Sequence, residues 1–379
     1  MQPDLKYDIV IIGAGIAGLS FAIQAAKAGY SVAVFEKEKS PLQKVCGGFV
    51  SNESWNFLQE LGVPLSEWNV PVTHHLEITT LKGNSYDFFL PLGGFGIDRT
   101  LLELQMKNIG KEAGVIFFEN CRVLNVLYRH QKMLVFTDKG ETEAAVVIGA
   151  YGNYTRLDSK WKRTFALKKP NRLNHFVGVS YQIKALLNEE KLSYHQFKHG
   201  FCTITPLGEH LYTLSYITHA SFFKKMKLDI QELETQVLRK NSHISNIFQS
   251  AIFLNEAPLS ISRISFNKKS QIEQHILMIG DAAGSIPPIA GNGISMALHS
   301  SHIAFEQVND FLKGKINRFE MELQYTQIWE KKFGKNMWLG RIFQSLLSLS
   351  FSDKIIGWMA KYMHSILSKL IRKTEGQPF

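Results

Sequence analysis

A glycine-rich segment near the start of the sequence has the residue types needed to hold a pyrophosphate group. It reads Gly13-Ala14-Gly15-Ile16-Ala17-Gly18 and follows an apolar, β-branched run. In such a segment the first glycine makes a tight turn, the second lets the backbone approach the phosphates, and the third lets helix and strand pack closely. Glu36 lies about 20 residues further on, where a carboxylate accepts hydrogen bonds from ribose hydroxyls. Together with Lys37 beside it, this pattern predicts a dinucleotide site.

A second glycine-rich segment, Ile279–Ile294, also follows an apolar run and opens a helical pattern. Its expected binding residues are Gly280, Asp281, Gly291, Asn292, Gly293 and Ile294. The order Gly-Asp-Ala-Ala, proline, Gly-x-Gly resembles the second flavin motif of the superfamily that includes single-component aromatic hydroxylases and geranylgeranyl reductases. The resemblance implies FAD as cofactor, with the aspartate on a ribityl hydroxyl and the helix N-terminus facing the pyrophosphate and the flavin. A helix N-terminus suits the negative charge of a reduced flavin.

Two more residues are assigned to the cofactor by the same resemblance. Arg99, at the start of a helical pattern, matches an arginine that lies along the FAD phosphates, and its planar fork of donors suits phosphate. The backbone near Val123 corresponds to a contact with adenine. The alternative for Arg99, an ordinary surface arginine at a helix start, stays open.

The loop Lys44-Val45-Cys46-Gly47-Gly48 lies where such proteins pass a loop beside the flavin ring. Its Cys-Gly-Gly triplet resembles the geranylgeranyl reductase branch, which makes Cys46 the candidate catalytic residue. Two glycines allow backbone to approach a ring closely. The alternative is that Cys46 is a small buried apolar side chain.

One motif departs from the aromatic hydroxylases. They carry Gly-Ala-Asp-Gly in the middle of the chain, whereas this sequence has Gly149-Ala150-Tyr151-Gly152. In hydroxylases that aspartate is linked to flavin and nicotinamide binding, so Tyr151 argues against NAD(P)H, the expected electron donor, binding in the usual pose. With the ending Gly376-Gln377-Pro378-Phe379, the motifs resemble a set of bacterial FAD-dependent oxidoreductases.

Metal chemistry is not expected. His195 and His199 have the spacing of a metal-binding pair on a helix, but the segment reads as a strand, in which residues four apart lie about 13 Å from one another. The three cysteines include no Cys-x-x-Cys pair, which excludes a zinc-thiolate site of the usual spacing.

The surrounding pattern predicts an α/β fold with a discontinuous Rossmann-like domain. Buried strands at 6–12, 31–35, 145–148 and 276–279 alternate with helices, while 174–220 alternates as an antiparallel sheet does. We expect an FAD-binding domain from 1–72, 96–170 and 265–310. The remaining segments are expected to form a substrate domain (73–95 and 171–264) and a helical C-terminal region (311–379).

Charge and composition bound the partners. More than half of the net charge of +10 lies between Glu330 and Phe379, yet the tryptophans there stand at helical spacing among apolar residues. This favours core packing, or a lid over an apolar substrate, over nucleic-acid binding. A peripheral contact between the basic tail and an anionic membrane stays open. The N-terminus shows no export signal and the cysteine content fits a reducing, cytoplasmic setting; the oligomeric state is not predicted.

For the reaction, the sequence favours a monooxygenase that hydroxylates a hydrophobic, aromatic or polyketide-like small molecule in a closed pocket. One alternative is a flavin reductase of C=C bonds in a lipid-like substrate, as in the geranylgeranyl reductases. Another is a flavoprotein that binds a lipid-like ligand without turnover.

Overall fold

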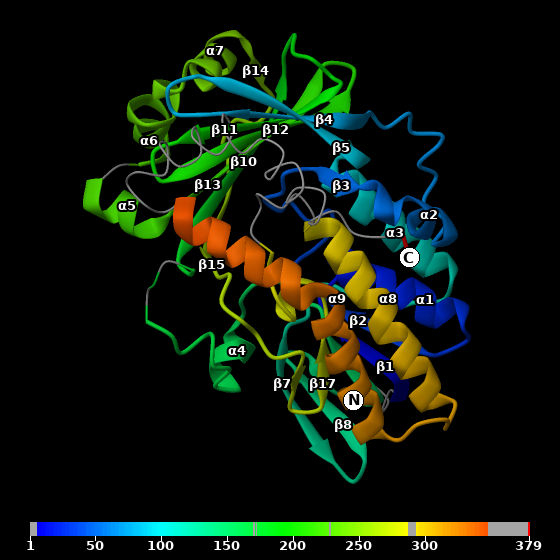
Figure 1. Ribbon diagram of the computed structural model, residues 1–379. Coiled ribbons are helices and arrows are strands. Elements are labelled where there is room, and N and C mark those ends of the chain that lie inside the picture. The colour runs from blue at the N-terminus through cyan, green and yellow to red at the C-terminus, as the bar shows by residue number, and fades with distance from the viewer. Residues whose placement is uncertain (1–5, 170, 172, 227–228, 287–292, 348–377) are drawn as a thin grey trace.

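The computed structural model describes residues 6–169, 171, 173–226, 229–286, 293–347 and 378–379. Two sheets, one above the other in Figure 1, divide the chain into two layers of structure. The first contains the parallel strands expected of a dinucleotide-binding fold, and the second is mostly antiparallel. The predicted fold class, α/β with a Rossmann-like unit, an antiparallel sheet and a helical C-terminus, is confirmed.

The first sheet has the order β16-β17-β9-β1-β2-β6, and β8 and β7 extend it from β9. Its strands are β1 (Lys6–Ile12), β2 (Val32–Phe35), β6 (Ile116–Phe118), β7 (Val123–Arg129), β8 (Lys132–Thr137), β9 (Gly140–Gly149), β16 (Ile272–Glu273) and β17 (Ile276–Met278). The central strands are parallel and buried on both faces, which explains the continuous apolar runs in the sequence.

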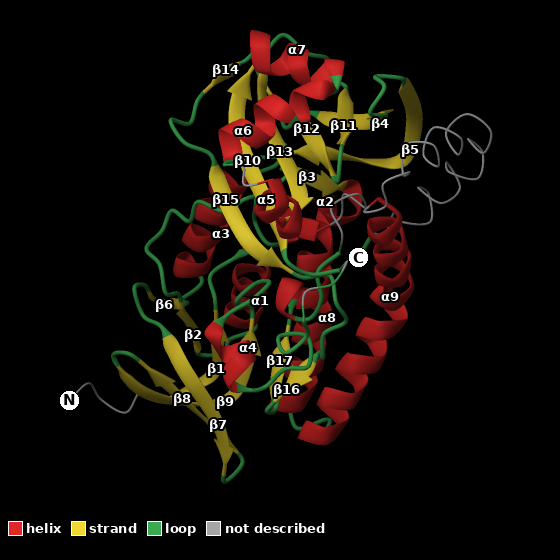
Figure 2. Cartoon of the chain, turned by 90° about the vertical axis from the view of Figure 1, so that its left-hand side faces the viewer, coloured by secondary structure: helices red, strands yellow, loops and turns green. Residues whose placement is uncertain are grey.

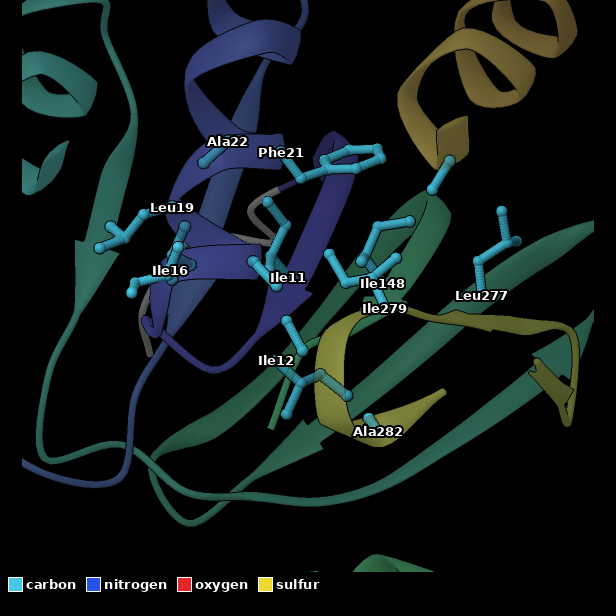
Figure 3. Packing of buried hydrophobic residues seen from close by; sticks show 14 of the residues in the cluster. Ile11, Ile12, Ile16, Leu19, Phe21, Ala22, Ile148, Leu277, Ile279 and Ala282 are labelled. Atoms are coloured by element: carbon cyan, nitrogen blue, oxygen red, sulfur yellow. The ribbon is translucent and has the colours of Figure 1, made fainter. Parts of the chain in front are cut away.

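Helices cover one side of this sheet. They are α1 (Ile16–Lys27), α3 (Arg99–Glu112) and α8 (Gly293–Leu312), and α9 (Arg318–Leu347) packs along α8 (Figure 1). In Figure 3, Ile16 and Leu19 of α1 pack close to Ile11 of β1, near Ile148 of β9. Both ends of a βαβ unit are therefore fixed by a dry core, and the loop between β1 and α1 is held at the carboxyl edge of the sheet.

The second sheet has the order β14-β10-β13-β12-β11-β4-β5-β3, with β15 also paired to β10. Its strands are β3 (Phe49–Ser51), β4 (Val72–Thr79), β5 (Ser85–Gly96), β10 (Phe176–Lys184), β11 (Lys191–Phe197), β12 (Gly200–Gly208), β13 (Leu211–His219), β14 (Ile252–Phe253) and β15 (Leu259–Ile264). β3 comes from a segment predicted to belong to the first domain, but it pairs with β5 of this sheet.

The remaining helices are short. They are α2 (Trp55–Glu60), α4 (Arg156–Lys160), α5 (Ala220–Met226), α6 (Ile230–Gln236) and α7 (Ser242–Ser250), with 3-10 turns η1 (Asn52–Ser54), η2 (Leu238–Lys240) and η3 (Gly280–Ala282). Figure 2 shows α6 and α7 on the side of the second sheet away from α1. No helix among the described residues combines the length and apolarity needed to cross a lipid bilayer.

Candidate functional site

Where β1 leads into α1, two of the three glycines cannot carry a side chain: Gly13 in the loop and Gly18 in the first turn of the helix. A Cβ atom on Gly13, whose φ is +107°, would stand 2.6 Å from the carbonyl oxygen of Ala150. A Cβ atom on Gly18 would stand 2.1 Å from the carbonyl oxygen of Gly13. Both contacts are with backbone that cannot move aside, so these glycines bring α1 directly onto the strands. Ala14, Ile16 and Ala17 between them are buried.

Gly15 faces a group of charged side chains instead. A Cβ atom there would lie 3.3 Å from Nζ of Lys44 and 3.9 Å from a terminal nitrogen of Arg99. Gly15 is also the N-cap of α1, no side chain caps the helix there, and its first turn carries no acidic residue. The first N–H groups of α1 and two cations thus converge at one glycine, an arrangement that suits a phosphate group.

The two cations share one carboxylate. Arg99 Nε donates to Glu103 Oε1 at 2.9 Å, and Lys44 Nζ lies 3.8 Å from Glu103 Oε2, while Glu103 itself is buried. Glu103 raises the pKa of Arg99 in spite of burial. Burial lowers the pKa of Lys44; the charge of Glu103 opposes this shift, and that of Arg99 adds to it. Two cations are therefore held side by side at the helix end.

The position of Arg99 is fixed by the N-terminus of α3, where it is the first residue. Asp98 is the N-cap of α3 and accepts from the N–H groups of Thr100 and Leu101. The other carboxylate oxygen of Asp98 accepts from Nε2 of Gln182 on β10 at 2.6 Å. This contact joins the helix that carries Arg99 to the second sheet.

Glu36 closes the first loop from the end of β2. Its Oε2 accepts from the N–H of Ala14 at 2.9 Å and its Oε1 from the N–H of Glu38 at 3.2 Å. The backbone carbonyl of Glu36 accepts from Cys121, two residues before Val123, so both predicted adenosine contacts lie at the same end of the site. Lys37, in contrast, is exposed and pairs with Glu38 at 3.1 Å.

The second glycine-rich segment brings Asp281 to the surface. Gly280 has a φ of +56°, and its N–H donates to Oγ of Ser300 on α8. Asp281 follows in η3 with an exposed side chain, and its charge acts on both Arg99 and Lys269. A carboxylate in this position is available to a ligand.

The helix that follows the second segment begins as the sequence predicts, at Gly293, with Ile294 buried behind it. Gly293 is exposed and has open space around it. The predicted residues Gly291 and Asn292 lie outside the described residues.

A buried lysine holds the loop that carries Asp281. Nζ of Lys269 donates to the backbone carbonyls of Asp281 and Asn153, both at 2.7 Å. Burial lowers the pKa of Lys269 to about 8, although the carboxylates of Asp281 and Asp158 oppose the shift. Lys269 is not among the residues predicted from the sequence, because nothing in its sequence neighbourhood marks it as buried.

Tyr151, which stands where aromatic hydroxylases have an acid, is part of a buried polar network. Its hydroxyl donates to Oδ1 of Asp158 and accepts from Nη1 of Arg163, each at 3.0 Å. Arg163 and Asp158 form an ion pair at 2.9 Å and are both almost fully buried. Arg163 also donates to the carbonyls of Ser270 and Ala282, which ties the network to the second glycine loop. Tyr151 therefore has its hydroxyl committed inside the protein.

The loop 44–48 spans the gap between the first glycine loop and the second sheet. At one end Lys44 faces Gly15; at the other, a Cβ atom on Gly47 would lie 3.6 Å from Oγ of Ser215. Between them Cys46 is half-buried, accepts weakly from the N–H of Gly48 at 3.3 Å, and interacts electrostatically with Arg99. Cys46 is thus a thiol next to a cation, at the boundary of the two layers.

The sheet face turned toward this loop mixes hydroxyls with aromatic rings. The side chains of Thr203, Thr213 and Ser215 lie behind Gly47 and Gly48. Beside them Tyr194 and Phe201 stack with ring centroids 5.9 Å apart. The opposite face packs Tyr181, Tyr216 and other apolar residues against α6 and α7. The face toward the loop 44–48 is thus partly polar, whereas the opposite face forms a hydrophobic core with α6 and α7.

Taken together, these features fit FAD. The uncapped N-terminus of α1, Lys44 and Arg99 suit the pyrophosphate, and Glu36 suits the adenosine ribose. The exposed carboxylate of Asp281 suits a hydroxyl of the ribityl chain. Lys44 and Lys269 extend the set predicted from the sequence. The position of Lys44 two residues before Cys46-Gly47-Gly48 was a usable signal for the first of them.

Comparison with known proteins agrees with this fit. The family model described as FAD dependent oxidoreductase matches residues 8–53. A digeranylgeranylglycerophospholipid reductase of Methanothermobacter thermautotrophicus is 23% identical, over 90% of this chain and 88% of its own. A kynurenine 3-monooxygenase of Christiangramia forsetii is 22% identical, over 86% of this chain and 75% of its own.

Solved structures share the whole architecture. A geranylgeranyl bacteriochlorophyll reductase-like protein from Thermoplasma acidophilum superposes with a TM-score of 0.78 over 99% of this chain and 96% of its own, at 18% identity. The flavin-dependent brominase Bmp2 has a TM-score of 0.79 over 99% of this chain and 94% of its own, also at 18% identity. At such identities the likeness concerns the fold, which flavoenzymes of several reaction types share.

Proposed function

We propose that this chain, which belongs to the FAD-dependent oxidoreductase superfamily, reduces carbon–carbon double bonds in a lipid-like substrate. The observation that carries the proposal is the position of Cys46. It is a thiol beside the Arg99 cation, on a loop between the cofactor-binding cluster and the inner face of the second sheet. The reductases among the relatives support the same reaction class.

In this proposal the cofactor is held by residues of both glycine-rich segments. Lys44, Arg99 and the N–H groups of α1 bind the pyrophosphate, Glu36 binds the adenosine ribose, and Asp281 binds the ribityl chain. Bound FAD, once reduced by an external electron donor, would supply the electron pair as a hydride. The remaining requirements, a proton and a dry setting, fall to the protein.

Saturating a double bond requires one hydride and one proton on neighbouring carbons. Sγ of Cys46 is a candidate to hold that proton, because Cys46 is half-buried on the loop between Lys44, which faces Gly15, and Gly47, which faces the second sheet. After proton transfer it would regain a proton from water. The buried rings of Tyr194 and Phe201 make the interior beside this loop apolar, which suits a hydrocarbon chain.

Monooxygenation of an aromatic substrate, which the sequence favoured, is a second candidate. The kynurenine 3-monooxygenase among the relatives favours it. The fixed hydroxyl of Tyr151 bears on the electron donor in either case, since no acid stands there to help bind a nicotinamide. We therefore expect reducing equivalents to be delivered in a pose that does not use this position.

The test uses the purified flavoprotein, reduced chemically without oxygen and mixed with a lipid that carries geranylgeranyl chains. The proposal predicts a product heavier by two hydrogens for each double bond that is reduced. Cys46→Ser is expected to slow the reaction by about a hundredfold or more, as the loss of a general acid does. Cys121→Ser, at a buried cysteine among core residues, is the matched control.

Three outcomes distinguish the candidates. A saturated product that depends on Cys46 supports the reductase. An unchanged lipid, together with insertion of one oxygen atom into a phenolic substrate when oxygen is admitted, supports the monooxygenase and overturns the reductase. No product from either class, with FAD bound, favours a flavoprotein that binds its ligand without turnover.

A further inference from the structure

Far from the flavin cluster, three metal-ligating side chains meet on the outer face of the second sheet. They are Glu77 of β4, His195 of β11 and His243 of α7, and one donor atom from each lies within 4.8 Å of the other two. The imidazole rings of His195 and His243 are nearly parallel, with centroids 5.5 Å apart. In Figure 1, α7 lies at the top of the molecule on the second sheet, whereas α1 lies lower, beside the first sheet.

The fold places these side chains together by strand register and a helix cap. β4 and β11 are parallel neighbours, with Ser193 opposite Glu77 and His195 opposite Thr79. Because residues two apart share a face, Glu77 and His195 project from the same side of the sheet. Asn241, the fully buried N-cap of α7, donates to Oγ1 of Thr79 and to the carbonyls of Thr80 and Gln196. These bonds fix the first turn of α7, and His243 with it, over the sheet.

Each imidazole is held by one nitrogen. Nδ1 of His195 lies 2.9 Å from Oγ1 of Thr79, and Nε2 of His243 lies 3.1 Å from the carbonyl oxygen of Gly83. Among the described residues, Nε2 of His195 and Nδ1 of His243 form no hydrogen bond, although His195 is only 3% exposed. A ring oriented through one nitrogen, with the other free, is the usual arrangement of a metal-binding histidine.

The carboxylate of Glu77 fits the same use. Oε1 of Glu77 accepts from Ser85 at 2.7 Å and Oε2 from Ser193 at 3.2 Å, which orients the group and leaves each oxygen a further lone pair.

We propose that Glu77, His195 and His243 form a binding site for one Zn²⁺ ion. Two imidazoles and one carboxylate are a ligand set that Zn²⁺ accepts, with a water completing four-coordination. With bonds of about 2.0–2.2 Å, tetrahedral ligands lie roughly 3.3–3.6 Å apart, so small side-chain rotations close the present spacing. The bound ion would select the tautomer in which Nδ1 of His195 donates to Thr79.

The ion would join α7 to two strands that are otherwise distant from it in the sequence. It would therefore stabilise the outer layer of the second sheet without touching the cofactor. Neither the proposal nor its test depends on the reaction that the flavin site performs.

The test is direct zinc binding to the full-length flavoprotein after chelator treatment and dialysis. We expect calorimetric titration with ZnCl₂ to give one ion per chain, and the melting temperature to rise with added zinc. His195→Gln, His243→Gln and Glu77→Gln should each weaken binding by at least about tenfold and abolish the rise in melting temperature. His75→Gln, at an exposed histidine on the same strand as Glu77, is the matched control and should bind as the wild type does.

Two results would overturn the proposal. One is no stoichiometric zinc binding by the wild type. The other is binding that the three variants retain at wild-type affinity, which would place zinc on other histidines. Flavin absorbance is recorded in the same samples, so a variant that has lost its fold is recognised by its loss of FAD. If a histidine variant unfolds, the comparison of wild type with Glu77→Gln, which keeps both imidazoles, decides the test.

Discussion

The ammonium nitrogen of Lys44 lies 3.3 Å from the point that a Cβ atom on Gly15 would occupy. Gly15 is the N-cap of α1 and has no side chain. The N-terminus of the helix is therefore open toward Lys44 and Arg99. A side chain added at Gly15 would meet the charged side chains of the site. At Gly13 and Gly18 it would instead clash with the backbone.

Gly15→Val is therefore predicted to remove FAD binding while the protein remains folded. The added methyl groups would fill the place where the phosphates meet the N–H groups of α1 and displace Lys44. Far-UV circular dichroism should stay unchanged while bound flavin absorbance is lost. Gly334→Ala, at a helical glycine with open space, is the control; it should keep FAD and stabilise α9 by about 0.5–1 kcal/mol.

Replacing either cation is predicted to weaken FAD binding without abolishing it. Lys44→Met and Arg99→Met each remove one charged donor, and we expect the dissociation constant to rise about ten- to a hundredfold. Wild-type affinity should also fall with added salt more steeply than that of either variant. Fluorescence titration of the apoprotein at several salt concentrations measures both. Equal affinities and equal salt slopes for wild type and variants would exclude these residues from the site.

The glycine loops show which parts of the site a sequence can reveal. Gly13, Gly18 and Glu36 act within one βαβ unit, so their spacing alone predicts where they lie. Lys269 supports the second loop from a segment with no glycine or charge pattern, and its burial depends on packing against Phe165. That contact arises only when two irregular segments that are distant in the sequence come together.

Lys269 gives a pH prediction. Its pKa is lowered from 10.5 to about 8 in the folded protein, so between these values the unfolded chain binds more protons than the folded one. The free energy of unfolding should therefore gain a contribution that rises with pH across this window, and the penalty of burying the charge is fully present below about pH 8. The effect is of the order of 1–3 kcal/mol.

Lys269→Met tests this by difference. Urea unfolding of both proteins from about pH 7 to about pH 10 gives the difference in their free energies of unfolding. As the pH rises, this difference should change in favour of the wild type. A difference in the free energy of unfolding that stays constant with pH would mean that the pKa of Lys269 is not lowered in the folded protein.

Tyr151→Phe is predicted to affect stability and not the cofactor. The substitution removes one hydroxyl from a buried network and leaves Arg163 and Asp158 paired with each other. A loss of about 1–3 kcal/mol in the free energy of unfolding is expected, with FAD affinity unchanged. Denaturant unfolding and FAD titration separate the two effects; a large loss of affinity at unchanged stability would show that the hydroxyl serves the cofactor.

The second sheet marks the limit of sequence analysis in another way. Alternation in the sequence indicates the strands at 176–184, 200–208 and 211–219, but not which face is turned toward the flavin domain. His195 shows the consequence: its sequence neighbour His199 lies in a turn with a φ of +70°, while its spatial partners Glu77 and His243 come from other elements. A spacing rule along one strand cannot find such a group.

The central claim is that the two glycine-rich segments build one FAD site. Equilibrium dialysis of FAD against the apoprotein tests it most directly, with wild type, Gly15→Val in the first segment and Asp281→Ala in the second. The structure predicts one FAD per wild-type chain, none retained by Gly15→Val, and clearly weaker binding by Asp281→Ala. Wild-type protein that binds no FAD, or variants of both segments that bind it as tightly as the wild type, would contradict the claim.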